Sequence, residues 1–142
     1  GRSGMNVVYY STRRGLAPQV AAAIHLRILP MEHPPNWFEW RRIPYRQGFT
    51  ARDWGRLVFV GWRDGHGIFV MAYPPRNGPL VAKVINSIQE LMDPGKTHFQ
   101  LVDAGAGGDV FPWRGHTVPA AVRELYPHLV ELVLGVERGL RG

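Results

Sequence analysis

A strand, a polar loop and a helix follow one another directly at the start of the chain, and this order admits few folds. Residues Asn6 to Tyr10 are mostly β-branched and aromatic, as in a buried strand. Residues Ser11 to Gly15 form a polar loop, and Pro18 suits a first helical turn, where no backbone N–H is needed. An apolar face at helical spacing follows, made of Val20, Ala21, Ile24 and Ile28. Pro30 is expected to end this helix, and a strand leading into a helix indicates an α/β domain.

The middle of the chain contains a hairpin pattern, a helix pattern and a further strand. Arg56 to Trp62 and Gly67 to Tyr73 are strand-like and are joined by Asp64-Gly65, a dipeptide that tolerates the positive φ of a tight antiparallel turn. Leu80 to Met92 has apolar residues at helical spacing, and His98 to Val102 is a further strand pattern.

Two less regular regions complete the pattern. Residues 31–45 are proline-rich and irregular, with a short helical turn expected at Trp37 to Trp40. Thr117 is expected to cap a short helix from Val118 to Tyr126, and Pro127 to start another helix that ends near Gly139. The predicted fold is a single three-layer α/β domain, with a mixed four- to five-stranded sheet, an antiparallel hairpin and helices on both faces.

Length and composition agree with one globular domain. The chain has 142 residues, of which 45% are hydrophobic. Residues 1–4 look like an expression scar, which leaves 5–142 as the domain. No apolar stretch approaches the roughly 18 residues of a membrane span, so we expect a soluble, cytoplasmic protein with no membrane partner. The absence of cysteine excludes disulfides, thiolate metal sites and cysteine nucleophiles.

The chain is basic, and arginine carries almost all of the positive charge. Its formal charge is +6, from 15 Arg and 2 Lys against 11 acidic residues. Guanidinium groups bind phosphate and carboxylate with two parallel hydrogen bonds, so an arginine surface suits anionic partners. Genomic base composition or growth temperature is an alternative cause of the Arg-to-Lys ratio.

The first candidate site is the loop between the first strand and the first helix. Ligands of open α/β sheets bind beyond the carboxyl ends of the strands, where a helix N-terminus offers unpaired N–H groups to an anion. The spacing matches neither the Walker pattern nor the dinucleotide fingerprint, and a solvated loop is the alternative. The candidate anion ligands are Ser11, Thr12, Arg13, Arg14, Gly15 and Gln19.

Two segments of the chain resemble known proteins: the strand from Val7 to Ser11, and the segment from Val20 to Leu26 with its Ala-Ala-Ala-Ile-His-Leu helix. They resemble the opening of a domain-of-unknown-function family of short α/β proteins from spore-forming bacteria. The hairpin from Arg56 to Tyr73 resembles the middle of that family, so the resemblance covers about half the chain. The family usually has Cys where Ser11 stands and small residues at Arg13 and Arg14. The resemblance therefore implies a fold, and it carries no thiol chemistry to this chain.

The same opening is similar in layout to low-molecular-weight tyrosine phosphatases. Their cysteine nucleophile, and the loop arginine that directly precedes a Ser-Pro pair at the start of the helix, are absent here. That enzymatic assignment is rejected, and only the anion-binding geometry of the loop is kept.

The second candidate site follows the strand from His98 to Val102. The run from Asp103 to Asp109 is glycine-rich and should emerge beside the first loop if the two strands are parallel. A flexible surface connection is the alternative. Its candidate ligand-binding residues, with those just beyond it, are Asp103, Gly105, Gly107, Arg114 and His116. No spacing suggests a metal site, and no metal or cofactor is predicted.

The third candidate is the aromatic and basic segment from Trp37 to Arg63, with a net charge of +4. Alternating rings and guanidinium groups are typical of single-stranded nucleic-acid grooves, but they are also enriched at protein interfaces. Plain core packing with solvated charges is a third reading. The residues of this alternative site are Trp37, Trp40, Arg41, Arg42, Arg46 and Arg52.

The sequence thus predicts a binding function without assigning a reaction. The main hypothesis is an anionic, phosphorylated small molecule bound at residues 11–19. The alternative is a nucleic-acid- or protein-binding module that uses residues 37–63. Whether the chain is an enzyme or a homo-oligomer is left open.

Overall fold

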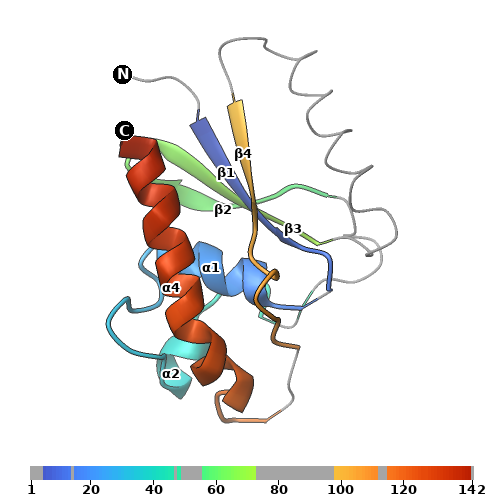
Figure 1. Cartoon of the computed structure of the whole chain (residues 1–142). Coiled ribbons are helices and arrows are strands. Elements are labelled where there is room, and N and C mark those ends of the chain that lie inside the picture. Colours follow the sequence, from blue (N-terminus) through green and yellow to red (C-terminus); the bar gives the residue numbers. More distant parts are fainter. Residues whose placement is uncertain are drawn as a thin grey trace.

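The computed structural model describes residues 5–13, 15–46, 48, 56–72, 98–111 and 115–141. The described elements are four strands and three helices, a mixture typical of an α/β domain (Figure 1). In chain order they are β1 (Met5–Ser11), α1 (Ala17–His25), α2 (Trp37–Trp40), β2 (Val58–Arg63), β3 (His66–Ala72), β4 (His98–Asp103) and α4 (Ala120–Arg141). The predicted helix from Leu80 to Met92 lies outside the described residues.

The four strands form one mixed sheet in the order β2-β3-β1-β4. β1 is parallel to β3 and to β4, whereas β2 and β3 are antiparallel and joined at Asp64-Gly65. Asp64 and Gly65 have φ values of 51° and 81°, as a tight turn of this kind requires. The α/β class, the mixed sheet and the hairpin are therefore confirmed. Because β1, β3 and β4 run in the same direction, their carboxyl ends share one edge of the sheet.

The main core lies on the face of the sheet that α1 and α4 cover. Val7 and Tyr9 of β1 point to this face and are fully buried, together with every residue of α1. α4 packs beside α1, and its last turn lies near the start of β1 (Figure 1). α1 can be wholly buried because its face toward β1 and its face toward α4 are both apolar.

α1 ends earlier than the proline at position 30 suggests. The helix stops at His25, because Arg27 adopts a left-handed conformation with φ of 60°. The N–H of Ile28 donates to the carbonyl of Ala23, and that of Arg27 to the carbonyl of Ile24. This pattern is a Schellman motif, which usually places glycine where Arg27 stands. The expected end at Pro30 is thus corrected to His25.

α4 is one helix rather than the predicted two. It begins at Ala120, three residues after the expected cap at Thr117, and runs through Pro127 to Arg141. Pro127 is exposed, so its missing N–H interrupts the helix only on the solvent side. The buried stripe continues across it from Val122 and Tyr126 to Leu129 and Val133, and this packing outweighs the proline. In the described part of the chain, no helix is long and apolar enough to cross a bilayer.

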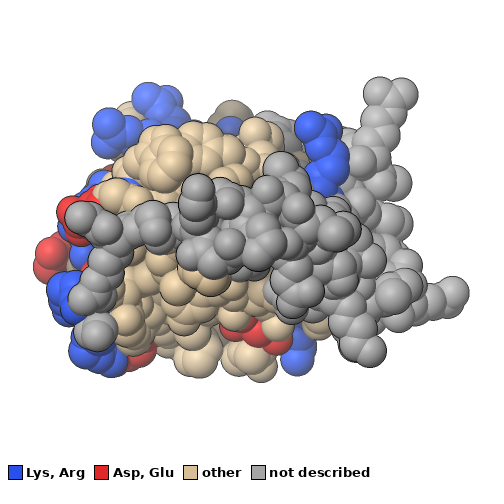
Figure 2. Space-filling view, turned by 90° about the horizontal axis from the view of Figure 1, so that it is seen from above, with Lys and Arg blue, Asp and Glu red and all other residues tan. Residues whose placement is uncertain are grey.

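The other face of the sheet carries a row of aromatic rings. Phe59, Phe69 and Phe99 follow one another with ring centroids 5.4 and 5.6 Å apart. A bulge between Phe59 and Gly61 shifts the register of β2 and places Trp62 beside Phe59, at 5.3 Å. Trp62 is 67% exposed. Figure 2 shows a largely uncharged surface beside the grey atoms on the side of the molecule that it views.

Candidate functional site

The two predicted loops meet at the carboxyl edge of the sheet. β1 and β4 pair in parallel through Tyr10 and Asp103, and the N–H of Ala104 donates to the carbonyl of Tyr10. The chain after β1 and the chain after β4 therefore leave the sheet side by side, as the parallel arrangement predicts. The N–H of Leu16 donates to the carbonyl of Val110, at 2.5 Å, which joins the far ends of the loops.

The carboxylate of Asp109 lies at the N-terminus of α1. Its Oδ1 accepts hydrogen bonds from the N–H of Ala17 at 2.7 Å and of Val110 at 2.8 Å. Its Oδ2 accepts one from the hydroxyl of Ser11 at 2.5 Å, and the N–H of Arg13 donates to the Ser11 oxygen at 3.0 Å. α1 has no cap from its own N-cap residue, Leu16. An anionic group therefore occupies the position that the sequence assigns to a ligand, and it comes from the chain itself.

Two glycines let these groups approach. A Cβ atom at position 15 would overlap the carboxylate of Asp109, and one at position 105 would overlap the hydroxyl of Ser11. Neither glycine has the positive φ that would by itself explain its presence. Close approach of a backbone to a polar group is a common reason for glycine in a loop.

Gly15→Ala should lower the free energy of unfolding by about 1–3 kcal/mol, the usual cost of overpacking. The added methyl group collides with a carboxylate that three hydrogen bonds hold in place. Urea denaturation measures the effect. Gly65→Ala is an unsuitable control because of its positive φ, whereas Gly139→Ala meets no atom within 4 Å and should not lower stability. Equal stability of Gly15→Ala and the wild type would contradict this packing.

The other predicted ligands of the first loop differ in accessibility. Thr12 is partly buried and Arg13 is exposed, whereas Arg14 lies outside the described residues. Gln19 is 2% exposed, and neither its amide nitrogen nor its amide oxygen has a hydrogen-bond partner. Helical side chains lean toward the N-terminus of their helix, so a buried, unpaired amide in the first turns of α1 marks this end of the helix as polar.

The predicted ligands of the second loop do not all converge. Asp103 Oδ1 accepts from the N–H of Gly105 at 2.9 Å and so closes a local turn. A Cβ at Gly107 would lie 2.8 Å from Nε2 of His128 in α4. His116 packs edge-on against Trp37 with centroids 5.7 Å apart, and Arg114 lies outside the described residues. The sequence identified this loop but selected Asp103, whereas Asp109 is the residue that reaches α1.

The comparisons with known proteins point to one family. Residues 6–113 match the model of a family described as "Protein of unknown function (DUF3189)". The chain belongs to this family. Neither the search of curated proteins nor that of solved structures gives a match.

The DUF3189 match includes both loops of the site. It covers 108 of the 142 residues, from β1 through β4 and on past Asp109, and so extends beyond the half of the chain that the sequence resemblance suggests. The prediction of a domain-of-unknown-function family is confirmed. α4 follows the matched residues, so any contact between α4 and α1 lies partly outside the region that defines the DUF3189 family.

A second polar cluster of this DUF3189 protein lies at the opposite end of α1. The hydroxyl of Tyr9 is 2.8 Å from Nδ1 of His25, and Nε2 of His25 is 3.9 Å from Oε1 of Glu137 in α4. Arg27 contacts both carboxylate oxygens of Glu137, at 2.8 and 3.0 Å. Sequence reasoning misses Glu137. The missed signal is that Glu137 follows Leu129 and Val133 at helical spacing, on the buried stripe of α4.

Burial controls the protonation of this cluster. Desolvation lowers the pKa of His25 to about 4, against the opposing effect of the Glu137 carboxylate. Burial also raises the pKa of Tyr9, which therefore stays protonated. Burial opposes ionisation of Glu137, but the hydrogen bond and charge of Arg27 outweigh it, so the pKa of Glu137 is lowered. At neutral pH the cluster contains a neutral imidazole next to an Arg–Glu ion pair.

The aromatic and basic segment is divided between core and surface. Trp40 is 3% exposed and belongs to the core, so it cannot stack on a nucleic-acid base. Trp37 is partly buried, and the guanidinium of Arg46 lies 5.2 Å from its ring. Arg41 and Arg42 are exposed, with Arg41 lying 5.1 Å from the ring of Phe38. Arg52 lies outside the described residues.

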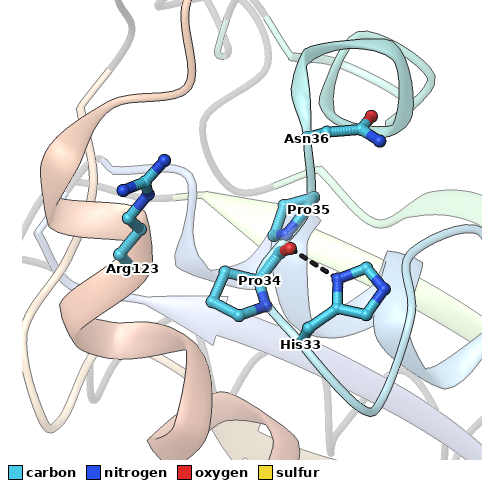
Figure 3. Close-up of a pocket in the computed structure, with 5 residues that line it drawn as sticks. All are labelled: His33, Pro34, Pro35, Asn36 and Arg123. Carbon is cyan, nitrogen blue, oxygen red and sulfur yellow. Dashed lines mark hydrogen bonds between the residues drawn. The ribbon is translucent and has the colours of Figure 1, made fainter.

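A shallow cavity of about 370 Å³ lies between α4 and the chain that precedes α2. Figure 3 shows Arg123 extending from α4 on one side and Asn36 at the start of α2 on the other. Asn36 Oδ1 accepts from the N–H of Glu39, and Nδ1 of His33 lies 2.8 Å from the Pro34 carbonyl. Among the five lining residues, Arg123 is the one with a permanent charge. The described residues contain no group of His, Asp or Glu suited to a metal ion.

Proposed function

We propose that this protein binds a small anionic, phosphorylated molecule at residues 11–19, in exchange with the carboxylate of Asp109. The observation that carries the proposal is the pair of backbone N–H groups, from Ala17 and Val110, that hold Asp109 Oδ1. These donors are directed at a negatively charged oxygen, and the dipole of α1 favours negative charge at the same position. A phosphate oxygen satisfies the same donors.

The surroundings of Asp109 support an exchange rather than a permanent cap. Asp109 belongs to a loop with glycines at 105, 107 and 108, and Gly108 has φ of 127°, which only glycine adopts easily. Two negative groups repel each other at one binding position, so a ligand can bind at the N-terminus of α1 only when the Asp109 carboxylate moves away from it. Arg13 is exposed at the edge of the loop and is suited to a second phosphate oxygen.

A thermal-shift titration with inorganic phosphate at constant ionic strength tests this proposal. A ligand that binds only the native state raises Tm with the logarithm of its concentration over Kd. We expect phosphate to raise the Tm of the wild type and not that of Arg13→Ala/Arg14→Ala. Phosphate should raise the Tm of Asp109→Ala by more than that of the wild type, because the carboxylate that competes with phosphate has been removed.

Arg41→Ala/Arg42→Ala is the matched control, since it removes the same charge from another adjacent pair of arginines. It should respond to phosphate as the wild type does. If phosphate raises the Tm of both double variants equally, it binds through diffuse charge. If phosphate raises the Tm of Asp109→Ala by no more than that of the wild type, the exchange with Asp109 is contradicted.

The alternative function, binding of nucleic acid or of a protein through residues 37–63, keeps one supporting observation. Phe38, Phe59 and Trp62 are 66%, 45% and 67% exposed, more than most large apolar side chains. Nucleic-acid binding should fall steeply with salt. Binding of a short oligonucleotide at two salt concentrations, in the wild type and in Arg41→Ala/Arg42→Ala, separates this function from the first.

A further inference from the structure

A small cavity of about 80 Å³ lies at the amino end of the sheet, at the other end of β1 from Ser11. Three elements contribute to it: the last turn of α1, the turn between β2 and β3, and the last turns of α4. Figure 1 shows the end of α4 beside the β2–β3 hairpin. The polar side chains that line the cavity include His25, Arg27, Arg63, His66, Glu137 and Arg141.

Buried polar atoms without hydrogen bonds meet in this cavity. Arg63 Nε is buried and has no hydrogen-bond partner, and Glu137 Oε1 lies 3.9 Å away from it, too far for a hydrogen bond. Oε1 itself makes no hydrogen bond, although a nitrogen of Arg27 lies at 2.8 Å. Buried polar atoms are nearly always satisfied in folded proteins, so an unpaired donor on a guanidinium group needs an explanation.

The imidazole of His25 presents a donor to the same space. Tyr9 is fully buried and its hydroxyl has to donate, and Nδ1 of His25 is the acceptor at 2.8 Å. Neutral His25 therefore carries its proton on Nε2, the nitrogen that lies 3.9 Å from Glu137 Oε1. His66 uses Nδ1 to donate to the Met5 carbonyl at 2.9 Å, so only its protonated form offers a second donor.

The charges around the cavity favour an anion. Arg27 neutralises Glu137 through contacts with both carboxylate oxygens. Asp64 is 82% exposed and lies 3.7 Å from Arg63 Nε, so solvent screens most of its charge. With three arginines and two carboxylates, the lining has a formal surplus of one positive charge. The left rim of Figure 2, on the side where α4 ends, shows basic and acidic side chains next to each other.

We propose that this cavity binds a small oxyanion, with Arg63 and Arg141 as its charged ligands. An oxygen atom of the anion accepts a hydrogen bond from the Nε–H of Arg63, and Arg141 supplies the second positive charge. The volume of about 80 Å³ limits the anion to the size of phosphate, sulfate or a small carboxylate. This site is separate from the one at residues 11–19 and does not depend on it.

Histidine ring resonances provide the test, since His25 and His66 both line the cavity. We would titrate the full chain, labelled with ¹⁵N-histidine, with phosphate, sulfate and acetate in separate arms at pH 7 and constant ionic strength. We expect at least one anion to give a saturable shift of the resonances of both rings. The arm that saturates distinguishes a tetrahedral oxyanion from a carboxylate.

Four variants locate the anion. Arg63→Gln and Arg141→Gln should each raise the apparent Kd at least tenfold. Arg141 is an exposed residue of the last helical turn, so its variant keeps the test valid if Arg63→Gln unfolds. Arg138→Gln makes the same change on an exposed part of α4 outside the cavity and should leave Kd unchanged. Arg13→Gln should also leave it unchanged, which separates this site from the proposed function. Shifts that do not saturate with any anion, or equal losses in Arg63→Gln and Arg138→Gln, would overturn the proposal.

Discussion

Replacing Asp109 by alanine should lower the free energy of unfolding by about 2–4 kcal/mol, although the residue lies in a glycine-rich loop. Its carboxylate accepts three hydrogen bonds, from Ser11, Ala17 and Val110. It also fills the capping role that Leu16 cannot. Without it, a serine hydroxyl that is almost fully buried and two N–H groups lose their acceptor at the start of a buried helix.

Urea denaturation measures this loss. The buffer must contain no phosphate or sulfate, because those anions would bind at the position that the carboxylate no longer occupies. Asp103→Ala is the matched control: the same change in the same loop removes one local hydrogen bond, to Gly105. Its expected cost is about 0.5–1.5 kcal/mol. A loss for Asp109→Ala no larger than for Asp103→Ala would mean that the carboxylate does not hold the loop.

The two variants differ in a way that links stability to the proposed function. Oxyanions should restore part of the stability of Asp109→Ala and none of that of Asp103→Ala, because only the former opens the end of α1. Stability and binding thus make opposite demands on residue 109: the carboxylate that stabilises the empty site also competes with the ligand. Such a trade-off is common at functional sites.

Local patterns predict most of the fold because each depends on neighbouring residues. The first strand, the turn at Asp64-Gly65 and the strand from His98 are all found near their predicted positions. The errors occur where distant contacts decide. Val122 and Leu129 pack on the same core on either side of Pro127, and this contact keeps α4 continuous. Propensity alone cannot show such packing.

The candidate site follows the same division. Parallel strands bring the two loops to one edge of the sheet, and this part is predictable from topology. The sequence does not predict which aspartate reaches α1, because a glycine-rich loop can follow many backbone paths. Asp109 is 98 residues from Ser11 in sequence, and Glu137 is 110 from Arg27. Pairs at such separations leave no periodic signal in a single sequence.

The second large effect concerns pH. Between pH 6.5 and pH 4, His25 alone should remove about 3 kcal/mol from the free energy of unfolding. Burial lowers its pKa to about 4 in the folded protein, from 6.5 in the unfolded chain. Within this window the unfolded chain binds a proton that the folded chain does not, so stability falls as pH falls. Below about pH 4 both states are protonated, and the loss from His25 is complete.

His25→Gln isolates this effect, because glutamine keeps an acceptor for the Tyr9 hydroxyl but does not titrate. The difference in unfolding free energy between the wild type and this variant, measured by urea denaturation at half-unit pH steps, should change by about 3 kcal/mol across the window. His33→Gln, which removes an exposed histidine, should leave the profile unchanged. A constant difference would mean that His25 is protonated when folded and paired with Glu137.

The ion pair of Glu137 responds to acid in a different window, which keeps the two contributions apart. Its pKa is lowered in the folded protein by Arg27, so its contribution is complete above the unfolded value of 4.5 and is lost only below it, as pH falls through the folded pKa. A loss of stability that begins near pH 6.5 therefore reports His25, and a further loss below pH 4.5 that disappears in Glu137→Gln reports the ion pair.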